Sequence, residues 1–151
     1  MFNKKRTLKD ILLEEHQIPE SFYIQEKDLT EWKIKKGAKQ IPRVHKKTGE
    51  PYFYREGKVA FPETLDKPSR TILTREGGTY IAREKHIIFQ NGKYRRLHPI
   101  ELERLNGFPD DFTKCDGITD NQRAFFMGNA LVIGIIEKLG KELSKAINKI
   151  K

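Results

Sequence analysis

An α+β fold is predicted by this sequence of 151 residues: a small, irregular antiparallel β unit flanked by short N-terminal helices and a C-terminal helical segment. Two observations support the prediction. Short runs of β-branched and aromatic residues, separated by glycine and proline, fill the middle of the chain. Apolar residues recur at helical spacing near both ends. We therefore divide the chain into lead-in helices with a basic loop (1–50), a β-rich region (51–97) and a helical C-terminal segment (98–151).

The first of these regions is expected to form two short helices and a basic loop. Residues 7–15 place Leu8, Ile11 and Leu12 on one helical face, and residues 26–36 favour a second short helix. Residues 33–47 contain seven lysine and arginine residues and no acidic residue. Because glycine and proline interrupt this basic run, we expect a mobile cationic loop.

The second region carries the signals of short strands. The clearest signal is residues 86–97, in which Asn91 and Gly92 separate two β-type runs. Both residues tolerate the positive φ angles of a tight turn, so we expect a two-stranded hairpin here. Four further β-type runs, bounded by glycine and proline, are residues 52–54, 59–61, 71–73 and 79–81.

The third region is expected to be helical. Pro99 suits the first turn of a short helix and Gly107 suits its end. Thr119 and Gln122 have the spacing of a capping box that opens a second helix. Residues 131–150 carry apolar residues at helical spacing, which predicts a long final helix.

The start of that final helix, residues 131–136, is apolar on every side. Such a helix needs to be enclosed by other protein. Most of the remaining apolar residues are used by the predicted β unit. Either protein outside this sequence covers the segment, or the segment is a short apolar cluster buried within the chain. The sequence leaves both alternatives open.

The charge of the chain favours a polyanionic partner. Its 30 lysine and arginine residues outnumber 21 aspartate and glutamate residues, which gives a net charge of +9. Nucleic acid is the first partner that such an excess indicates, and a membrane surface is the second. A well-solvated surface without such a partner is the alternative.

Several classes of protein are disfavoured by what the sequence does not contain. No apolar segment follows the charged residues 1–9, as a signal peptide requires, and no stretch approaches the roughly 20 apolar residues of a membrane span. One cysteine excludes an internal disulfide, and four scattered histidines give no metal-ligand spacing. We expect a soluble, cytoplasmic protein with no membrane partner and no bound metal.

Three segments together resemble a known enzyme family. Residues 95–112, RRLHPIELERLNGFPDDF, resemble the ninth conserved block of DNA cytosine-5 methyltransferases, and residues 122–139, QRAFFMGNALVIGIIEKL, resemble the tenth. Residues 68–78 are similar to the Thr-Leu element and glycines of that family's target-recognition region, with Ile72 in place of leucine. The resemblance covers nearly the whole chain. The positions that match the ninth block are Arg95 or Arg96, Leu97, Pro99, Glu101, Arg104, Gly107, Phe108, Pro109 and Asp110.

The resemblance is to the C-terminal portion of such an enzyme. The family's catalytic Pro-Cys pair, its Glu-Asn-Val block and its glycine-rich cofactor motif are not in the sequence. Cys115 lies between lysine and aspartate in an expected loop and does not match the nucleophile. The resemblance therefore implies a target-recognition region plus blocks nine and ten, such as the small subunit of a split enzyme, with no catalytic residue of its own.

For residues 51–97 the resemblance implies contact with duplex DNA. A methyltransferase turns its target base out of the duplex, so one protein face grips the groove while another performs the chemistry. Backbone groups of the glycine pair could meet base edges, and neighbouring polar side chains could read the major groove or hold phosphates. A plain turn, solvated charges and strand packing are the alternatives. The candidate DNA-binding residues are Thr71, Ile72, Thr74, Arg75, Gly77, Gly78, Arg55 and Lys58.

The two conserved blocks receive different expected roles. In the ninth block, Glu101 and Glu103 would repel phosphates, so we expect this block to organise the recognition region, with Arg104 or Arg96 in internal ion pairs. The resemblance implies that the tenth block touches the methionine end of S-adenosyl-L-methionine. Amides near a helix start favour a carboxylate, and an alanine replaces a serine that is frequent in the family. The candidate cofactor-binding residues are Gly128, Asn129 and Ala130.

The sequence thus predicts a DNA-recognition component of a DNA (cytosine-5-)-methyltransferase in restriction-modification. Methyl transfer from S-adenosyl-L-methionine to cytosine in duplex DNA would need a partner: a catalytic subunit or an N-terminal half that supplies the cysteine and the glutamate. A homodimer could cover the final helix in isolation. The alternative is a truncated or stand-alone basic DNA-binding module without catalysis. An RNA-associated protein is disfavoured because no exposed aromatic pairs of the base-stacking kind are evident.

Overall fold

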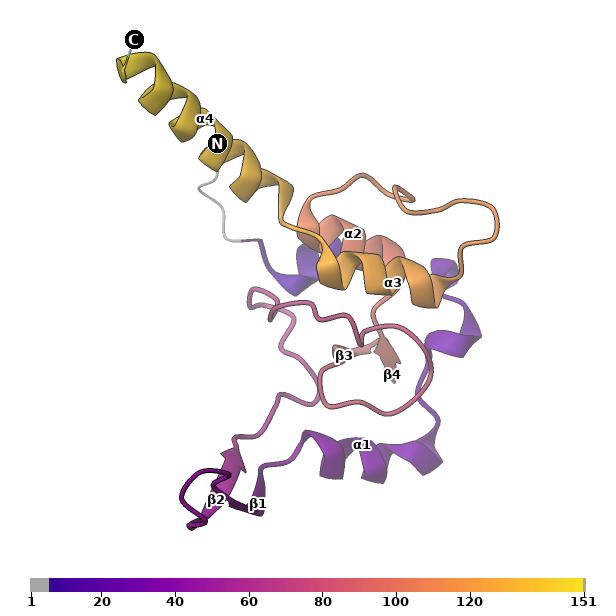
Figure 1. Cartoon of the computed structure of the whole chain (residues 1–151). Helices are drawn as coiled ribbons and strands as arrows, with labels where there is room; N and C mark the ends of the chain where they lie inside the picture. The colour runs from indigo at the N-terminus through magenta and orange to yellow at the C-terminus, as the bar shows by residue number, and fades with distance from the viewer. Residues whose placement is uncertain (1–5, 151) are drawn as a thin grey trace.

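The computed structural model describes residues 6–150, so the outermost residues of the predicted first and third regions lie outside the described part. Short helices precede two separate two-stranded antiparallel sheets, and three α-helices follow them, which confirms the predicted α+β fold (Figure 1). In chain order the elements are η1 (Leu8–Ile11), η2 (Glu15–Gln17), η3 (Glu20–Phe22), η4 (Glu26–Asp28), α1 (Leu29–Lys36), β1 (Lys39–Val44), β2 (Pro51–Glu56), β3 (Ile87–Gln90), β4 (Lys93–Arg96), α2 (Pro99–Asn106), α3 (Asp120–Asn129) and α4 (Ile133–Ile150).

The helix predicted over residues 7–15 is wrong in type, although its apolar face is buried as expected. The segment forms short 3-10 turns, and Leu8 and Ile11 are each 1% exposed. The backbone N–H of Leu13 donates to the buried carboxylate of Glu101 (2.9 Å) instead of continuing a helix. Because a short segment gains little from helix nucleation, such tertiary contacts decide its local structure.

The loop predicted over residues 33–47 is also wrong. Its first part completes α1, as the prediction for residues 26–36 requires, and its second part is β1, which pairs with β2 in antiparallel register. Pro42 lies within β1, where its missing N–H is tolerated because a two-stranded sheet has only edge strands. All six residues of β1 are exposed. The strand was therefore not predicted, because the run is basic and none of its side chains is buried.

The hairpin predicted over residues 86–97 is confirmed. Strands β3 and β4 pair in antiparallel register, and Asn91 and Gly92 take φ angles of 50° and 81° in the turn between them. Of the other predicted strands, residues 52–54 lie in β2, whereas three runs form extended connections without strand pairing: residues 59–61, 71–73 and 79–81. Next to residues 79–81, the side chains of Lys85 and Arg96, not a partner strand, donate to the backbone carbonyl groups of Gly77 and Gly78.

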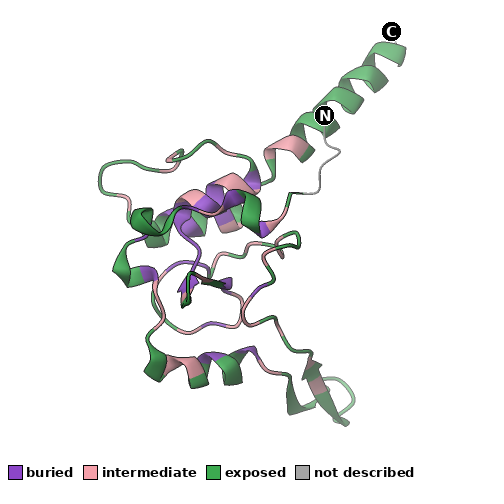
Figure 2. Ribbon diagram, turned by 180° about the vertical axis from the view of Figure 1, so that it is seen from behind, coloured by how far each residue is buried: buried purple, intermediate pink, exposed green. Residues whose placement is uncertain are grey.

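The core lies where α2 and α3 cover η1 and the β3–β4 hairpin, and the buried residues concentrate there (Figure 2). Both predicted helix boundaries are correct. Pro99 is the first residue of α2 and Gly107 ends it with a φ angle of 83°, while Thr119 and Gln122 form the predicted capping box of α3. The buried apolar cluster consists of Leu8, Ile11, Ile88, Leu97, Leu102, Ala124 and Met127.

Helix α4 extends away from the core (Figure 1). Leu131 is 66% exposed and Ile135 58% exposed, so the apolar start of the final helix is not buried within the described chain. Of the two alternatives that the sequence left open, internal burial is therefore wrong. The exposed apolar face continues along the helix through Leu139 and Leu143. No helix among residues 6–150 combines the length and the apolar character needed to cross a membrane.

Candidate nucleic-acid interface

The recognition loop, residues 71–78, lies against α3 from the first turn of that helix to its last. At one end, a Cβ atom on Gly77 would lie 2.7 Å from the backbone oxygen of Asn121. At the other end, a Cβ atom on Gly128 would lie 2.5 Å from the backbone carbon of Leu73. Real Cβ atoms do not approach backbone so closely, so both contacts depend on glycine. The two glycines thus let the loop and the helix pack backbone to backbone.

The loop exposes alternate residues. Thr71, Leu73 and Arg75 are exposed, whereas Ile72 packs against the apolar core and Thr74 is half-buried. The Arg75 guanidinium lies 5.8 Å from the ring centroid of an exposed tyrosine and 3.6 Å from the carboxylate of Glu84. The outward row thus has one apolar, one hydroxyl and one cationic side chain. The packing alternative is correct for Ile72, and exposure leaves the predicted role of Thr71 and Arg75 available.

The glycine pair does not present its carbonyl groups to solvent, which corrects the expectation for Gly77 and Gly78. The Lys85 ammonium donates to both carbonyl oxygens, at 2.5 and 2.6 Å, and Arg96 donates to the Gly78 oxygen at 2.6 Å. Gly77 itself is buried. Each carbonyl oxygen is thus engaged from inside the chain, which leaves it less available to a base edge. The pair serves close packing and a tight turn, with a φ angle of 73° at Gly78.

Lys85 is itself wholly buried, with its ammonium 3.8 Å from the ring centroid of Tyr80. Burial, together with the neighbouring Arg96 charge, lowers the pKa of Lys85 to about 7. A neutral amine retains two N–H donors, which matches the two carbonyl groups it binds. Lys85 had no signal in the sequence, because it stands outside any motif in a run of polar residues.

Because the pKa of Lys85 is about 7 in the folded chain and 10.5 in its ordinary state, stability should depend on pH. Between those values the unfolded chain binds a proton that the folded chain does not, so raising the pH favours folding. We expect the free energy of unfolding in urea to rise by about 2 kcal/mol from this residue between pH ~7 and ~9. Lys85→Met should lose that part of the rise, and an identical pH slope in both proteins would contradict the assignment.

A second buried array fixes the two ends of the recognition loop. His86 donates its backbone N–H to one carboxylate oxygen of Glu76 (2.9 Å), and its Nδ1 atom lies 2.6 Å from the other. The opposite ring nitrogen lies 3.0 Å from the hydroxyl of Ser69, just before the loop. Next in the chain, Arg70 forms an ion pair with Glu63 at 2.7 Å. Buried side chains therefore fix the position of the loop, and none of them was among the residues predicted from the sequence.

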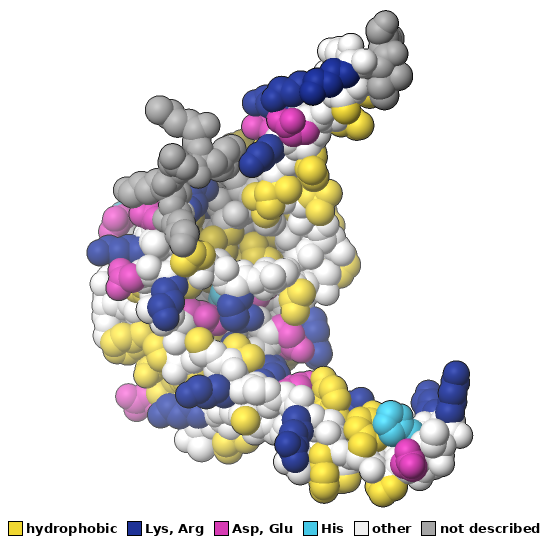
Figure 3. Space-filling view, turned by 90° about the vertical axis from the view of Figure 1, so that its left-hand side faces the viewer, with side chains coloured by type: hydrophobic (Ala, Val, Ile, Leu, Met, Phe, Trp, Pro, Cys, Tyr) yellow, Lys and Arg dark blue, Asp and Glu magenta, His cyan; other side chains and the backbone are white. Residues whose placement is uncertain are grey.

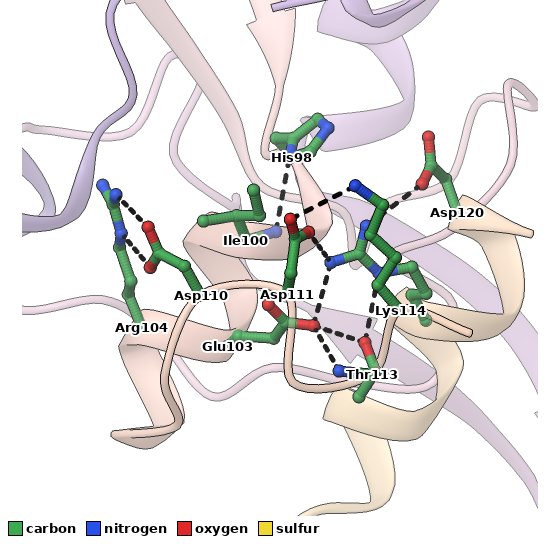
Figure 4. Close-up of polar contacts among 10 residues, drawn as sticks. His98, Ile100, Glu103, Arg104, Asp110, Asp111, Thr113, Lys114 and Asp120 are labelled. Atoms are coloured by element: carbon green, nitrogen blue, oxygen red, sulfur yellow. Dashed lines mark hydrogen bonds and ion pairs between the residues drawn. The ribbon is translucent and has the colours of Figure 1, made fainter. Parts of the chain in front are cut away.

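The ninth block organises its surroundings through ion pairs, as predicted (Figure 4). Arg104 binds both carboxylate oxygens of Asp110, at 2.7 and 2.6 Å, and the pKa of Asp110 is lowered by these bonds. The buried Glu103 accepts from Arg123 at 3.0 Å. Arg96, the other candidate for an ion pair, instead donates to backbone carbonyl groups, so that alternative is wrong. Residues 95–99 and 101–103 of the block are buried, whereas residues 107, 109, 110 and 112 are exposed.

The three candidate cofactor-binding residues of the tenth block lie at or just after a helix end, not at a helix start. Gly128 and Asn129 are the last residues of α3, and Ala130 follows in extended conformation before α4 begins at Ile133. The expected carboxylate site at a helix N-terminus is therefore absent at the first two positions. The close backbone approach expected of Gly128 exists, but it is made to the recognition loop of the same chain.

A pocket of about 470 Å³ joins two of the predicted residue sets. Thr71 and Ile72 line one side, and Ala130 together with Leu131 lines another. Arg55 and Lys58 are not part of it, because they lie on and just after β2 in the separate β1–β2 hairpin. Within residues 6–150, no group of three or more histidine, cysteine, aspartate or glutamate residues could hold a metal ion.

Comparisons with known proteins identify the family of the chain. The family model for C-5 cytosine-specific DNA methylases matches residues 1–145. The chain is 38% identical over 144 residues to the type II methyltransferase M.Sau3AI of Staphylococcus aureus, covering 95% of this chain and 33% of that protein. It is 27% identical over 78 residues to the type II methyltransferase M.HhaI of Haemophilus parahaemolyticus, covering 52% of this chain and 23% of that protein. The chain thus spans about a third or less of the length of these relatives. It belongs to the family of C-5 cytosine-specific DNA methylases.

Proposed function

We propose that this chain is the DNA-recognition part of a cytosine-5 DNA methyltransferase of a type II restriction-modification system. It holds duplex DNA through the recognition loop. It transfers no methyl group until a catalytic half supplies the cysteine nucleophile and the assisting glutamate. That half is either a separate subunit or the N-terminal part of a longer chain.

The recognition loop carries this proposal, because it is rigid on one side and accessible on the other. Backbone contacts to α3 and the buried array around His86 fix its inner side. Thr71, Leu73 and Arg75 remain exposed on its outer side. Side chains held in one geometry lose little conformational entropy on binding, which favours selective recognition. Thr74, half-buried beside Gly128, then positions the loop more than it reads bases.

The pocket beside Ala130 suits only part of S-adenosyl-L-methionine. Its described lining combines apolar side chains such as Ile72 and Met127 with the basic residues Arg6 and Arg70. Arg6 and Arg70 could bind the carboxylate of the methionine portion, whereas no residue of this lining neutralises the cationic ammonium and sulfonium groups. No acidic residue lines the pocket to accept hydrogen bonds from ribose hydroxyls. The cofactor, which donates the methyl group, would therefore need further residues from the catalytic half.

The exposed apolar face of α4 supports a protein partner. Ile136 and Ile147 of α4 are 44% and 49% exposed, and Val132, just before the helix, is 38% exposed. An apolar face of this length in water indicates a surface that other protein covers. A stand-alone DNA-binding module, the alternative function, would leave this face uncovered unless two copies of the chain paired through it.

Reconstituted methyl transfer tests the proposal. The chain is mixed with the part of the Staphylococcus aureus relative that lies outside the matched segment, and transfer of labelled methyl groups to duplex DNA is measured. We expect transfer from the mixture and none from either part alone. Cys115→Ala should leave the rate unchanged, because Cys115 is exposed in a connection far from the recognition loop in sequence. Methylation by the isolated chain would contradict the proposal. So would the loss of methyl transfer from the mixture when the chain carries Cys115→Ala.

A further inference from the structure

The β1–β2 hairpin, residues 39–56, forms an arm that projects from the body. In the space-filling view the arm and α4 are the two projecting ends, and the outline between them is hollowed (Figure 3). The arm contains five lysine and arginine residues and two glutamates. Six residues per strand give it a length of about 20 Å.

Only part of the charge of the arm is neutralised within the arm. Lys39 forms an ion pair with Glu56 at 2.9 Å, and the guanidinium of Arg43 lies 4.1 Å from the ring centroid of Tyr54. The remaining cations have no hydrogen bond or ion pair through their side chains to any described residue: Lys46, Lys47 and Arg55. Uncompensated positive charge thus lies at the tip and on one face.

Four apolar residues of the arm lie on the face that carries Arg55: Pro42, Val44, Pro51 and Phe53. In the strand register Pro42 opposes Phe53, and Val44 opposes Pro51, so these side chains lie on one face, and Lys39 and Arg43 lie on the other. Phe53 is 57% exposed and Val44 62% exposed. An exposed apolar strip beside free cations matches a polyanion that also offers apolar sugar surface, as nucleic acid does.

The base of the arm is fixed to the interior that holds the recognition loop. Arg83 donates to the carbonyl oxygens of Gly37 (2.5 Å) and Gly57, and it forms an ion pair with Glu56 at 3.2 Å. These contacts grip the chain on both sides of the hairpin. Lys36, at the end of α1, donates to the carbonyl oxygen of Lys85, the residue that holds the glycine pair. These contacts therefore fix the position of the arm relative to the recognition loop.

We propose that the arm binds the phosphates of duplex DNA outside the base pairs that the recognition loop contacts. Lys46, Lys47 and Arg55 would each meet a phosphate, and Phe53 would lie against the adjoining sugars. At one base pair per 3.4 Å, about six base pairs lie within the length of the arm. This inference rests on the proposed function, in which the same duplex occupies the recognition loop.

Binding to DNA at different salt concentrations tests the arm. Anisotropy is measured for the full chain with a labelled mixed-sequence duplex of about three helical turns, from ~50 to ~200 mM salt. The double variant Lys46→Ala/Lys47→Ala is compared with Lys9→Ala/Lys27→Ala, which removes the same charge from exposed positions on η1 and η4. We expect the arm variant to bind about tenfold more weakly and its salt slope to fall by about two, one for each lost phosphate contact.

The possible outcomes separate the arm from the proposed function. Equal binding by the two double variants would overturn the arm inference, while binding by the unmodified chain would still support DNA recognition. A weaker arm variant with an unchanged salt slope would also overturn it, because the lost contact would not be to phosphates. No binding by any of the three proteins would overturn both proposals. Melting temperatures of both variants close to that of the unmodified chain show that folding is intact.

Discussion

Substituting Arg95 by methionine is expected to lower the free energy of unfolding by about 3–5 kcal/mol. Arg95 and Glu101 are both fully buried, and two parallel N–H···O bonds join them at 2.8 and 2.6 Å. Glu101 also accepts from the backbone N–H groups of Leu13 (2.9 Å) and His98 (2.7 Å). The variant leaves a carboxylate buried without its countercharge, at the point where the N-terminal turns meet α2. Urea unfolding monitored by circular dichroism measures the loss.

Two further variants show whether the charge is responsible. Arg55→Met makes the same substitution at an exposed position and should change stability by less than about 0.5 kcal/mol. Adding Glu101→Gln to Arg95→Met removes the uncompensated charge but keeps an acceptor for the backbone, so it should recover part of the loss. The stability loss of the double variant can be compared with the sum of the losses in Arg95→Met alone and Glu101→Gln alone. If the two are equal, packing and not charge explains the effect of Arg95.

Gly128→Ala is expected to separate the recognition loop from α3. The new Cβ atom would lie 2.5 Å from the backbone carbon of Leu73 and equally close to the Cα atom of Thr74. Neither backbone segment can yield as a flexible side chain would, so the loop must move. We expect a stability loss of at least about 2 kcal/mol and, because displacements of about 1 Å disturb reacting geometry, a fall of about 100-fold in reconstituted methyl transfer.

Gly140→Ala is the matched control, because a Cβ atom at that position of α4 meets no atom within 4 Å. It should stabilise the helix by about 0.5–1 kcal/mol and leave methyl transfer unchanged. Full activity of Gly128→Ala at normal stability would show that the loop does not depend on close packing with α3. Loss of activity in both variants would point to α4 and its partner instead.

The sequence predicted those parts of the fold that local chemistry determines. The tight turn at Asn91-Gly92, the helix bounded by Pro99 and Gly107 and the capping box at Thr119 each depend on a few neighbouring residues, and each is confirmed. The strand β1 was missed because its residues are basic and interrupted by proline, and only its pairing with β2 makes it a strand. The three unpaired β-type runs show the converse, since β propensity needs a partner strand.

The candidate interface was predicted in outline but not in its internal support. Gly77 was expected to let backbone approach DNA and Gly128 to let it approach the cofactor, whereas in the structure they approach α3 and the recognition loop of the same chain. Lys85 and His86 were missed because the hydrogen bonds of their side chains join residues seven or more positions away. No periodicity or spacing rule reports such contacts. The exposure of the apolar start of α4, by contrast, was one of the alternatives stated from the sequence.

Base-resolved sequencing of DNA from the reconstituted reaction is the most direct measurement of whether this chain reads DNA while its chemistry lies elsewhere. We expect methylated cytosines in one sequence context when the chain and a catalytic half are both present, and none when either is omitted. Methylation by the catalytic half alone in that same context would contradict this division, because recognition would not then reside in the loop that α3 carries.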